Sequence, residues 1–333
     1  MKKKIFITGG AGYVGSRLVD ELINDYDITV FDILYFGKEH LNHLSKKIKL
    51  IQGDIRDTNH LKESCANHDI FLHLACISND ASFSLNEKLS KSVNLDAFEP
   101  MVISAKSSGV KRFIYASTSS VYGISSEKNV REDHPLIPLT LYNKFKGMCE
   151  PLLTKHTDDN FTGVIFRPAT VCGYSKRQRL DLSVNILTNF AINKNKIVVF
   201  GGNQLRPNLH IIDYIRAVKL LIEADKNLIA NEIFNVGYQN LSINEIAMLV
   251  KKVVEKEFPN KKEIKIIKSE SDDNRSYHIN SDKVKEILGF QPKRSIEVAI
   301  KDLCDAFKNN LIPNSFEDEN YYNIKKMKLL NIK

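Results

Sequence analysis

The sequence lacks the features that mark membrane, secreted and zinc-stabilised proteins. No apolar run approaches the ~18 residues that span a bilayer. The N-terminal Met-Lys-Lys-Lys resembles the start of a signal peptide, but the apolar stretch behind it is short and interrupted by glycines. The five cysteines are odd in number, scattered and without Cys-x-x-Cys spacing, which argues against a disulfide framework or a structural zinc. We therefore expect a cytoplasmic protein with no membrane partner and no metal.

The chain also lacks any strong local excess of charge. Its 48 basic and 40 acidic side chains give a net charge of +8, but the lysines are spread along the sequence. A nucleic-acid-binding surface would show a basic stripe with interleaved aromatic residues. The pattern therefore favours a solvated surface and predicts no nucleic-acid partner, with an anionic ligand as the alternative reason for the basic excess.

A glycine-rich turn near the N-terminus is the most informative stretch. The apolar run 5–7 predicts a buried strand, Gly9, Gly12 and Gly15 follow it, and apolar residues at helical spacing come next. A strand, a tight turn and a helix place free backbone N–H groups against a pyrophosphate. The glycine spacing differs from the usual G-x-G-x-x-G pattern of dinucleotide sites, so an ordinary loop before a helix is the alternative.

Acidic residues after two later strands extend this prediction. Asp32 ends the expected strand 28–32, about 20 residues beyond the glycines, where a carboxylate can accept hydrogen bonds from the adenosine ribose. It would repel a 2′-phosphate, so the sequence favours NAD over NADP; a turn-forming Asp is the alternative. Asp54 and Ile55, in the exit loop of the next strand, are expected to flank the adenine ring.

The order of strands and helices predicts an α/β fold. The continuous apolar run 70–76 is typical of a parallel strand covered on both faces, and His73 within it is expected to be a core histidine. The expected strands of the first half are 5–7, 28–32, 48–52, 70–76, 112–117 and 162–167. One helix is expected over 87–108, kinked or divided at Pro100. We expect a Rossmann-type, doubly wound parallel sheet in 1–170, with return segments from about 211–240, and a smaller mixed α/β substrate lobe in 171–333.

Three polar residues add a proton-transfer set to this crevice. Tyr142 and Lys146 are four residues apart in an expected helix and so share one helix face. Thr118 follows strand 112–117, at the strand end that faces the ligand crevice. A phenol has a reference pKa near ~10, which a neighbouring ammonium and an oxidised nicotinamide would lower. We expect Tyr142 to act as the base, Thr118 to bind the same substrate oxygen, and Lys146 to hold the nicotinamide ribose.

These motifs, in this order, resemble the extended short-chain dehydrogenase/reductases that act on nucleotide sugars, the NAD-dependent epimerase/dehydratase group. The resemblance covers nearly the whole chain, from the glycine turn to the Leu-Gly-Phe-Gln-Pro run at 288–292. It implies a cofactor site made of Gly9, Gly12, Tyr13, Val14, Gly15, Asp32, Asp54, Ile55, Leu74, Ala75, Cys76, Asn94, Tyr142 and Lys146. It implies substrate contacts from Thr118, Arg179, Asn185, Arg206 and Arg275.

Arginines account for most of the implied substrate contacts. Arg206 matches the arginine that grips the nucleotide diphosphate in this group, and Arg275 resembles part of an Asp-x-Arg-x-Tyr pattern, with a surface arginine as the alternative. Arg177 and Arg179 either contact phosphate or cap the lobe. The resemblance also implies a homodimer formed through the helices at about 87–108 and 142–157.

Departures from the group's patterns narrow the reaction. Ser119 and Ser120 follow Thr118 where sugar dehydratases carry an acid pair, so the general acid and base for elimination are missing. The run 174–182 is similar to a subgroup that includes C4 dehydrogenases of capsule heptose nucleotides. We expect an NAD-dependent nucleotide-sugar epimerase, acting at C4 in surface polysaccharide biosynthesis. A C4 dehydrogenase or keto-reductase is the main alternative, and a non-catalytic dinucleotide sensor is a weaker one.

Overall fold

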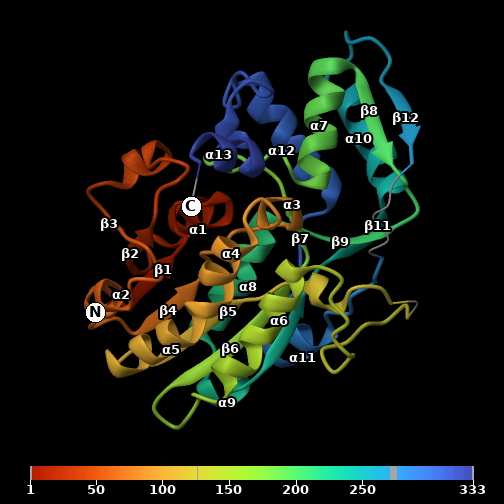
Figure 1. Ribbon diagram of the computed structural model, residues 1–333. Coiled ribbons are helices and arrows are strands. Elements are labelled where there is room, and N and C mark those ends of the chain that lie inside the picture. The colour runs from red at the N-terminus through yellow and green to blue at the C-terminus, as the bar shows by residue number, and fades with distance from the viewer. Residues whose placement is uncertain (1, 126, 271–275, 332–333) are drawn as a thin grey trace.

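A seven-stranded parallel sheet forms the centre of the protein, in a computed structural model that describes residues 2–125, 127–270 and 276–331 (Figure 1). The strand order is β10-β6-β5-β4-β1-β2-β3. The strands are β1 (Lys4–Thr8), β2 (Asp27–Asp32), β3 (Lys49–Gln52), β4 (Ile70–His73), β5 (Arg112–Ala116), β6 (Thr162–Pro168) and β10 (Ile233–Val236). The strand order reverses direction between β1 and β4, which is where ligands bind in sheets of this kind.

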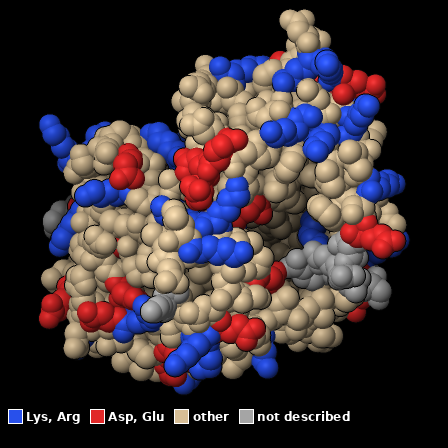
Figure 2. Space-filling view, turned by 45° about the horizontal axis from the view of Figure 1, so that its top comes forward, with Lys and Arg blue, Asp and Glu red and all other residues tan. Residues whose placement is uncertain are grey.

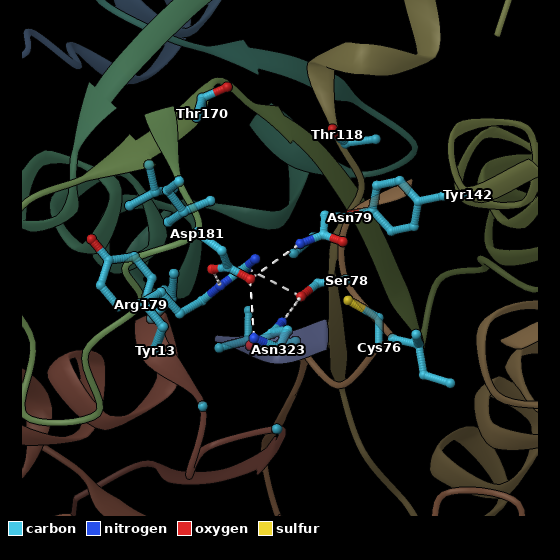
Figure 3. Close-up of a pocket in the computed structure, with 18 of the residues that line it drawn as sticks. Tyr13, Cys76, Ser78, Asn79, Thr118, Tyr142, Thr170, Arg179, Asp181 and Asn323 are labelled. Carbon is cyan, nitrogen blue, oxygen red and sulfur yellow. Dashed lines mark hydrogen bonds and ion pairs between the residues drawn. The ribbon is translucent and has the colours of Figure 1, made fainter. Parts of the chain in front are cut away.

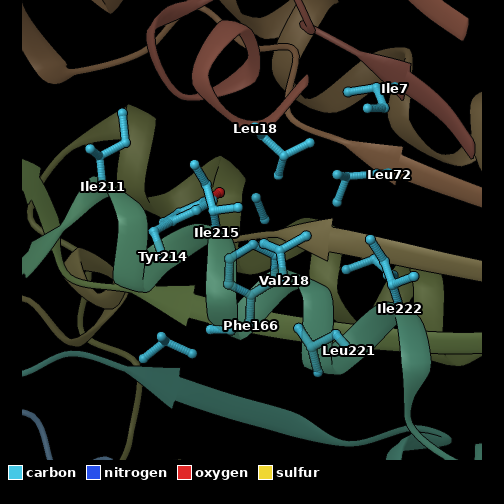
Figure 4. Packing of buried hydrophobic residues seen from close by; sticks show 14 of the residues in the cluster. Ile7, Leu18, Leu72, Phe166, Ile211, Tyr214, Ile215, Val218, Leu221 and Ile222 are labelled. Atoms are coloured by element: carbon cyan, nitrogen blue, oxygen red, sulfur yellow. The ribbon is translucent and has the colours of Figure 1, made fainter. Parts of the chain in front are cut away.

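Side chains of successive residues face opposite sides of this sheet, as a pleated strand requires. In β1, Ile7 packs with Leu18 and Ile215 in one core (Figure 4), whereas Phe6 packs in a second core on the other face. The first core lies under α1 (Tyr13–Leu22), α8 (Ile211–Glu223) and α11 (Asp282–Leu288), and the second under α2 (Thr58–Cys65), α5 (Phe98–Ser107) and α6 (Leu141–Thr154). Helices on both faces of a parallel sheet confirm the predicted Rossmann-type fold.

The smaller lobe has its own apolar core and two small sheets (Figure 1). The sheets are β11-β9-β7 and β12-β8, built from β7 (Thr170–Cys172), β8 (Lys196–Phe200), β9 (Leu205–His210), β11 (Gln239–Ser242) and β12 (Lys265–Ser269). The longer helices of the lobe are α7 (Ser183–Lys194), α10 (Ile243–Glu257) and α12 (Ile296–Lys308). Between these elements the chain returns to the large sheet, where β10 pairs with β6 and α8 lies against α1.

Short elements complete the fold. They are α3 (Asp80–Phe83), α9 (Lys226–Ile229), α13 (Asn323–Leu329) and the 3₁₀ turns Glu39–Leu44, Ser119–Tyr122 and Glu319–Tyr321. Across the described residues, no helix combines the length and the apolar character needed to cross a bilayer.

The helix predicted over 87–108 is divided into three pieces. The helix α4 (Glu87–Lys91) runs into a π-helical turn, Ser92–Asp96, before α5 begins. The N–H of Ala97 donates to the carbonyl of Ser92, five residues back, at 3.1 Å. The irregularity therefore lies ahead of Pro100, which is the third residue of α5, where the absence of an N–H costs no hydrogen bond within that helix.

Strands β7, β9 and β11 have no counterpart in the sequence prediction. β7 is three residues long, and β9 contains Pro207 and several polar side chains, so neither shows a strand-like apolar pattern. Pairing with each other stabilises these segments: β9 lies parallel to β7 and antiparallel to β11.

Candidate active site

A cavity of about 770 Å³ lies where the carboxyl ends of β1, β2, β4 and β5 approach the smaller lobe. This volume is typical of a small-molecule site. Figure 2 shows the surface hollowed between the main body and the smaller lobe, with charges of both signs interspersed over the face in view. Most of the predicted site residues line this single cavity.

The glycine-rich turn forms the part of the cavity wall at the end of β1. Gly9 has a φ of +76°, and a Cβ there would lie 2.5 Å from the backbone nitrogen of Ala75. A Cβ on Gly15 would lie 2.3 Å from the carbonyl oxygen of Gly9. Gly12 is the N-cap of α1, and no described side chain caps this helix start. The turn therefore offers uncapped N–H groups, including those of the neighbouring Tyr13 and Val14, and fits the diphosphate of a dinucleotide.

Asp32 lies beside this turn with a fixed carboxylate. Its Oδ2 accepts the N–H of Ala11 at 3.0 Å and its Oδ1 accepts the N–H of Leu34 at 2.8 Å. Burial raises the pKa of Asp32, and these two backbone donors oppose that rise. The carboxylate is thus held at the strand end where a ribose acceptor is expected.

The remaining predicted adenine contacts lie at the end of β3. Asp54 and Ile55 both line the cavity. The Asp54 carboxylate is engaged by Arg56, whose Nη2 lies 2.5 Å from Oδ2, so the side chain is fixed by an ion pair. This ion pair has no counterpart in the sequence prediction.

The segment after β4 carries three predicted cofactor residues, Leu74, Ala75 and Cys76, all of which line the cavity. Asn94 is placed differently. It is buried, is not among the lining residues, and exchanges two hydrogen bonds of 2.9 Å with the backbone of Ile77. In the structure Asn94 therefore fixes the wall of the cavity from behind.

Tyr142 and Lys146 enter the cavity from the first two turns of α6, which begins at its N-cap Thr140. The ammonium of Lys146 is buried, donates to the carbonyl of Ala116 at 2.6 Å and lies 4.8 Å from the centre of the Tyr115 ring. These contacts fix the Lys146 side chain at the carboxyl end of β5.

The pKa of Tyr142 in the protein without cofactor lies above its ordinary value. Burial raises the pKa of Tyr142 well above 10.0, Cys76 and Asp80 add to the rise, and the Arg179 guanidinium lowers it. Removal of a phenolate from water is the dominant cost here, and the lowering predicted for Lys146 together with an oxidised nicotinamide stays a prediction. In the protein alone Tyr142 is therefore a protonated phenol.

Thr118 lies at the end of β5 within a chain of polar contacts. Its Oγ1 lies 2.8 Å from Oγ of Ser120 and accepts the N–H of Ser120 at 3.2 Å. Ser120 in turn donates to Oδ1 of Asn143 at 2.5 Å. Thr118 is thus tied to α6, one residue from Tyr142, and both side chains line the same cavity.

The run 174–182 lies across the cavity wall. Arg177 and Arg179 are both buried and both line the cavity. Nε of Arg179 is paired with Asp181 at 2.8 Å, and its Nη1 donates to Ser78 at 3.1 Å. Figure 3 shows Arg179 and Asp181 on one side of the cavity and Tyr142 on the other.

The other three predicted substrate-binding residues differ in where they lie relative to the cavity. Arg206 lines the cavity from β9 and donates to its neighbour's carbonyl at 2.9 Å. Asn185 is fully buried, is not a lining residue, and bonds Gly173, Tyr13 and the backbone of Arg179. Asn185 thus holds the wall and does not face the cavity. Arg275 lies outside the described residues.

Asn323 and Asn79 are among the cavity residues that have no counterpart in the sequence prediction. Asn323, at the start of α13, is buried; its N–H donates to Asp181 at 3.1 Å and its Nδ2 donates to Ser78 at 2.9 Å (Figure 3). Asn79 has a φ of +72°, unusual for a residue with a side chain, and donates to Asp181 at 3.4 Å. No local motif marks Asn323, whereas Asn79 stands in a Ser-Asn-Asp run just after a strand.

Comparisons with known proteins agree with this geometry. A UDP-glucose 4-epimerase of Lactobacillus helveticus is 27% identical, over 95% of this chain and 100% of the relative. UDP-glucuronic acid decarboxylase 1 of Arabidopsis thaliana is 29% identical, over 93% of this chain and 71% of the relative. The structure of a UDP-glucuronic acid 4-epimerase from Bacillus cereus, in complex with UDP-glucuronic acid and NAD, is 27% identical with a TM-score of 0.80, covering 92% of this chain and 99% of that one.

The two sequence relatives differ in reaction, one an epimerase and the other a decarboxylase, so likeness to them does not define the reaction. The NAD dependent epimerase/dehydratase family matches residues 5–237, which is more than half of the chain and includes the glycine turn, Asp32, Thr118, Tyr142 and Lys146. The predicted cofactor, NAD, is that of the family. The chain therefore belongs to the NAD-dependent epimerase/dehydratase family.

Proposed function

We propose that the protein is a nucleotide-sugar epimerase that acts at C4 of the sugar, in the biosynthesis of a surface polysaccharide. The observation that carries the proposal is that Thr118, Tyr142 and Lys146 line the same cavity as the glycine turn and Asp32. One relative is a UDP-glucose 4-epimerase, and another was solved in complex with UDP-glucuronic acid. Both support a nucleotide-sugar substrate.

The proposed chemistry is a reversible oxidation of the sugar. Bound NAD supplies the hydride acceptor. Tyr142 takes the proton of the C4 hydroxyl, Thr118 holds the same oxygen, and Lys146 orients the nicotinamide ribose and favours the phenolate when the site is assembled. Once the keto sugar has turned over in the cavity, the hydride returns to the other face of C4 and Tyr142 returns the proton to the C4 oxygen, which completes the epimerisation.

The smaller lobe is proposed to hold the nucleotide end of the substrate. Arg206 lines the cavity on that side, and a guanidinium can bind a diphosphate through two parallel hydrogen bonds. Arg179, fixed by Asp181, is proposed to contact the sugar side because its charge acts on Tyr142.

The absence of an elimination pair supports epimerisation over dehydration. The residues that follow Thr118 are Ser119 and Ser120, and Ser119 is buried. Hydroxyl groups cannot replace a carboxylic acid and a carboxylate as general acid and base near neutral pH.

The proposal is tested by incubating the purified protein with UDP-glucose, UDP-galactose and UDP-glucuronic acid and identifying the products by NMR. We expect a C4 epimer of unchanged mass without added oxidant or reductant. Loss of water or carbon dioxide would contradict the proposal, and stoichiometric release of a keto sugar would favour the dehydrogenase. Tyr142→Phe should abolish conversion, whereas Tyr238→Phe, an exposed tyrosine of the smaller lobe, should leave it unchanged.

A further inference from the structure

Arg177 is a buried cation whose hydrogen bonds are only partly satisfied. It is 5% exposed and lines the cavity. Its Nη2 donates to Oδ1 of Asn323 at 2.7 Å, its guanidinium lies 3.7 Å from the centre of the Phe36 ring, and its Nε is buried with no hydrogen-bond partner among the described residues. Burial lowers the pKa of Arg177 to about 9. A buried charge in this condition is costly unless an anion joins it.

The segment that carries Arg177 is fastened to the start of α1. Oγ of Ser175 donates to the carbonyl of Tyr13 at 2.8 Å and lies 3.0 Å from Oγ of Ser16. The Tyr13 hydroxyl donates to the carbonyl of Gly173 at 2.7 Å. These contacts keep Arg177 close to the uncapped helix start.

The neighbouring arginine, Arg179, differs from Arg177 in having an ion-pair partner. Arg179 has a carboxylate partner, Asp181, at 2.8 Å. Arg177 has no ion pair within the described ranges, and its guanidinium donates to the neutral amide of Asn323. The charges of Asp32 and Asp181 act on Arg177 without forming an ion pair with it. A directly paired counter-charge would therefore come from a ligand.

We propose that Arg177 binds the diphosphate of the dinucleotide cofactor, together with the backbone N–H groups of the glycine turn. Asn323, which enters from α13 near the C-terminus, is a positioning residue that orients the guanidinium. This inference goes beyond the proposed function, because it concerns cofactor binding and not the sugar reaction. A purely structural arginine would instead join the lobes through Phe36 and Asn323.

Binding of nucleotides to the nucleotide-free protein separates the two roles. In Arg177→Gln, the affinities for NAD and ADP should fall by about 10- to 100-fold, because a charge-assisted hydrogen bond is lost. The affinities for adenosine and UDP should not change. The melting temperature of nucleotide-free Arg177→Gln should be equal to or higher than that of the original protein. Lys176→Gln removes an exposed charge from the same segment and should change none of these values.

Three results in Arg177→Gln would overturn the proposal. They are an unchanged affinity for ADP, an equal loss of affinity for ADP and adenosine, and a loss of affinity for UDP but not for ADP. The last result would move Arg177 to the substrate's diphosphate. Titration calorimetry gives the affinities for NAD, ADP, adenosine and UDP without any measurement of activity, so this test is independent of the reaction.

An isosteric variant tests the same point if Arg177→Gln does not fold. Asn323→Asp gives Arg177 an internal counter-charge that competes with the diphosphate. It should weaken NAD binding by about tenfold or more. Unchanged NAD affinity in this variant would show that Arg177 has only a structural role.

Discussion

Arg167 and Glu150 form an ion pair in the protein interior, with Nη2 and Oε2 2.6 Å apart and both side chains almost fully buried. Oε1 of Glu150 also accepts hydrogen bonds from Nε of Arg167 at 3.0 Å and from Ser117 at 2.6 Å. Glu150 lies one helical turn after Lys146, and Ser117 directly precedes Thr118. The pair therefore ties the two sides of the proposed catalytic set to strand β6.

Removal of one partner of this pair should be strongly destabilising. Glu150→Ala leaves the Arg167 charge buried without its counter-charge, and we expect a loss of about 3–5 kcal/mol in the free energy of unfolding, measured with urea. Glu99→Ala removes a carboxylate from a partly exposed pair with Lys155 and should cost under about 1 kcal/mol. Similar losses in the two variants would contradict this account.

A methyl group at Gly15 should disrupt cofactor binding more than folding. The added Cβ would lie 2.3 Å from the carbonyl oxygen of Gly9, so the turn must open. We expect NAD affinity to fall by at least about tenfold in Gly15→Ala, as measured by calorimetry on protein whose circular dichroism is unchanged. Gly147→Ala is the matched control, because its Cβ would meet side chains at an ordinary 3.5 Å. Equal affinity in the two variants would refute the assignment of the turn.

Stability should fall in mild acid because of His73. Burial lowers the pKa of His73 well below 6.5, the Lys146 charge lowers it further, and Oγ1 of Thr8 lies 2.7 Å from its Nδ1. The folded protein keeps the ring neutral, whereas the unfolded chain binds a proton below about pH 6.5. The contribution of His73 is therefore present above that pH and is lost below it, by up to about 1.4 kcal/mol per pH unit.

His73→Gln should reduce this pH dependence. We expect a smaller slope of unfolding free energy between about pH 5 and 7 in this variant than in the original protein. A slope equal to that of the original protein in His73→Gln would show that His73 titrates alike in both states.

The homodimer predicted from the resemblance can be tested on the two helices that it names. Ile103 on α5 and Met148 on α6 are 48% and 44% exposed, and the helices lie against each other. We propose that they meet a second copy, so Ile103→Glu and Met148→Glu should shift the mass in light scattering toward the monomer. Met248→Glu, at a 60% exposed position of α10, should not. A monomer before substitution would contradict the proposal.

The sequence predicted those parts of the site that follow from local pattern. The glycine turn, Asp32 and the Tyr142–Lys146 pair are each defined by short spacing, and each lies at a strand end or in the first two turns of a helix. Asn185 shows where this reasoning fails. A polar residue beside a ligand and one that holds a wall have the same local sequence, and only the packing of Asn185 against Tyr13 separates them.

Two other features depend on contacts that the sequence does not display. Asn323 reaches the cavity from near the C-terminus and bonds Ser78 across 245 residues. The pKa of Tyr142 in the protein without cofactor is raised chiefly by the burial of its ring, which depends on residues far apart in the sequence. Long-range packing decides both.

The central claim is that Tyr142 is the base in hydride transfer to NAD, and single-turnover kinetics test it most directly. The original protein and Tyr142→Phe are loaded with NAD, mixed with the nucleotide sugar that the original protein converts, and followed by nicotinamide absorbance. We predict reduction of the nicotinamide in the original protein, about 10²- to 10⁴-fold slower reduction in Tyr142→Phe, and equal NAD affinity in both. Equal rates of reduction in the two proteins would contradict the account.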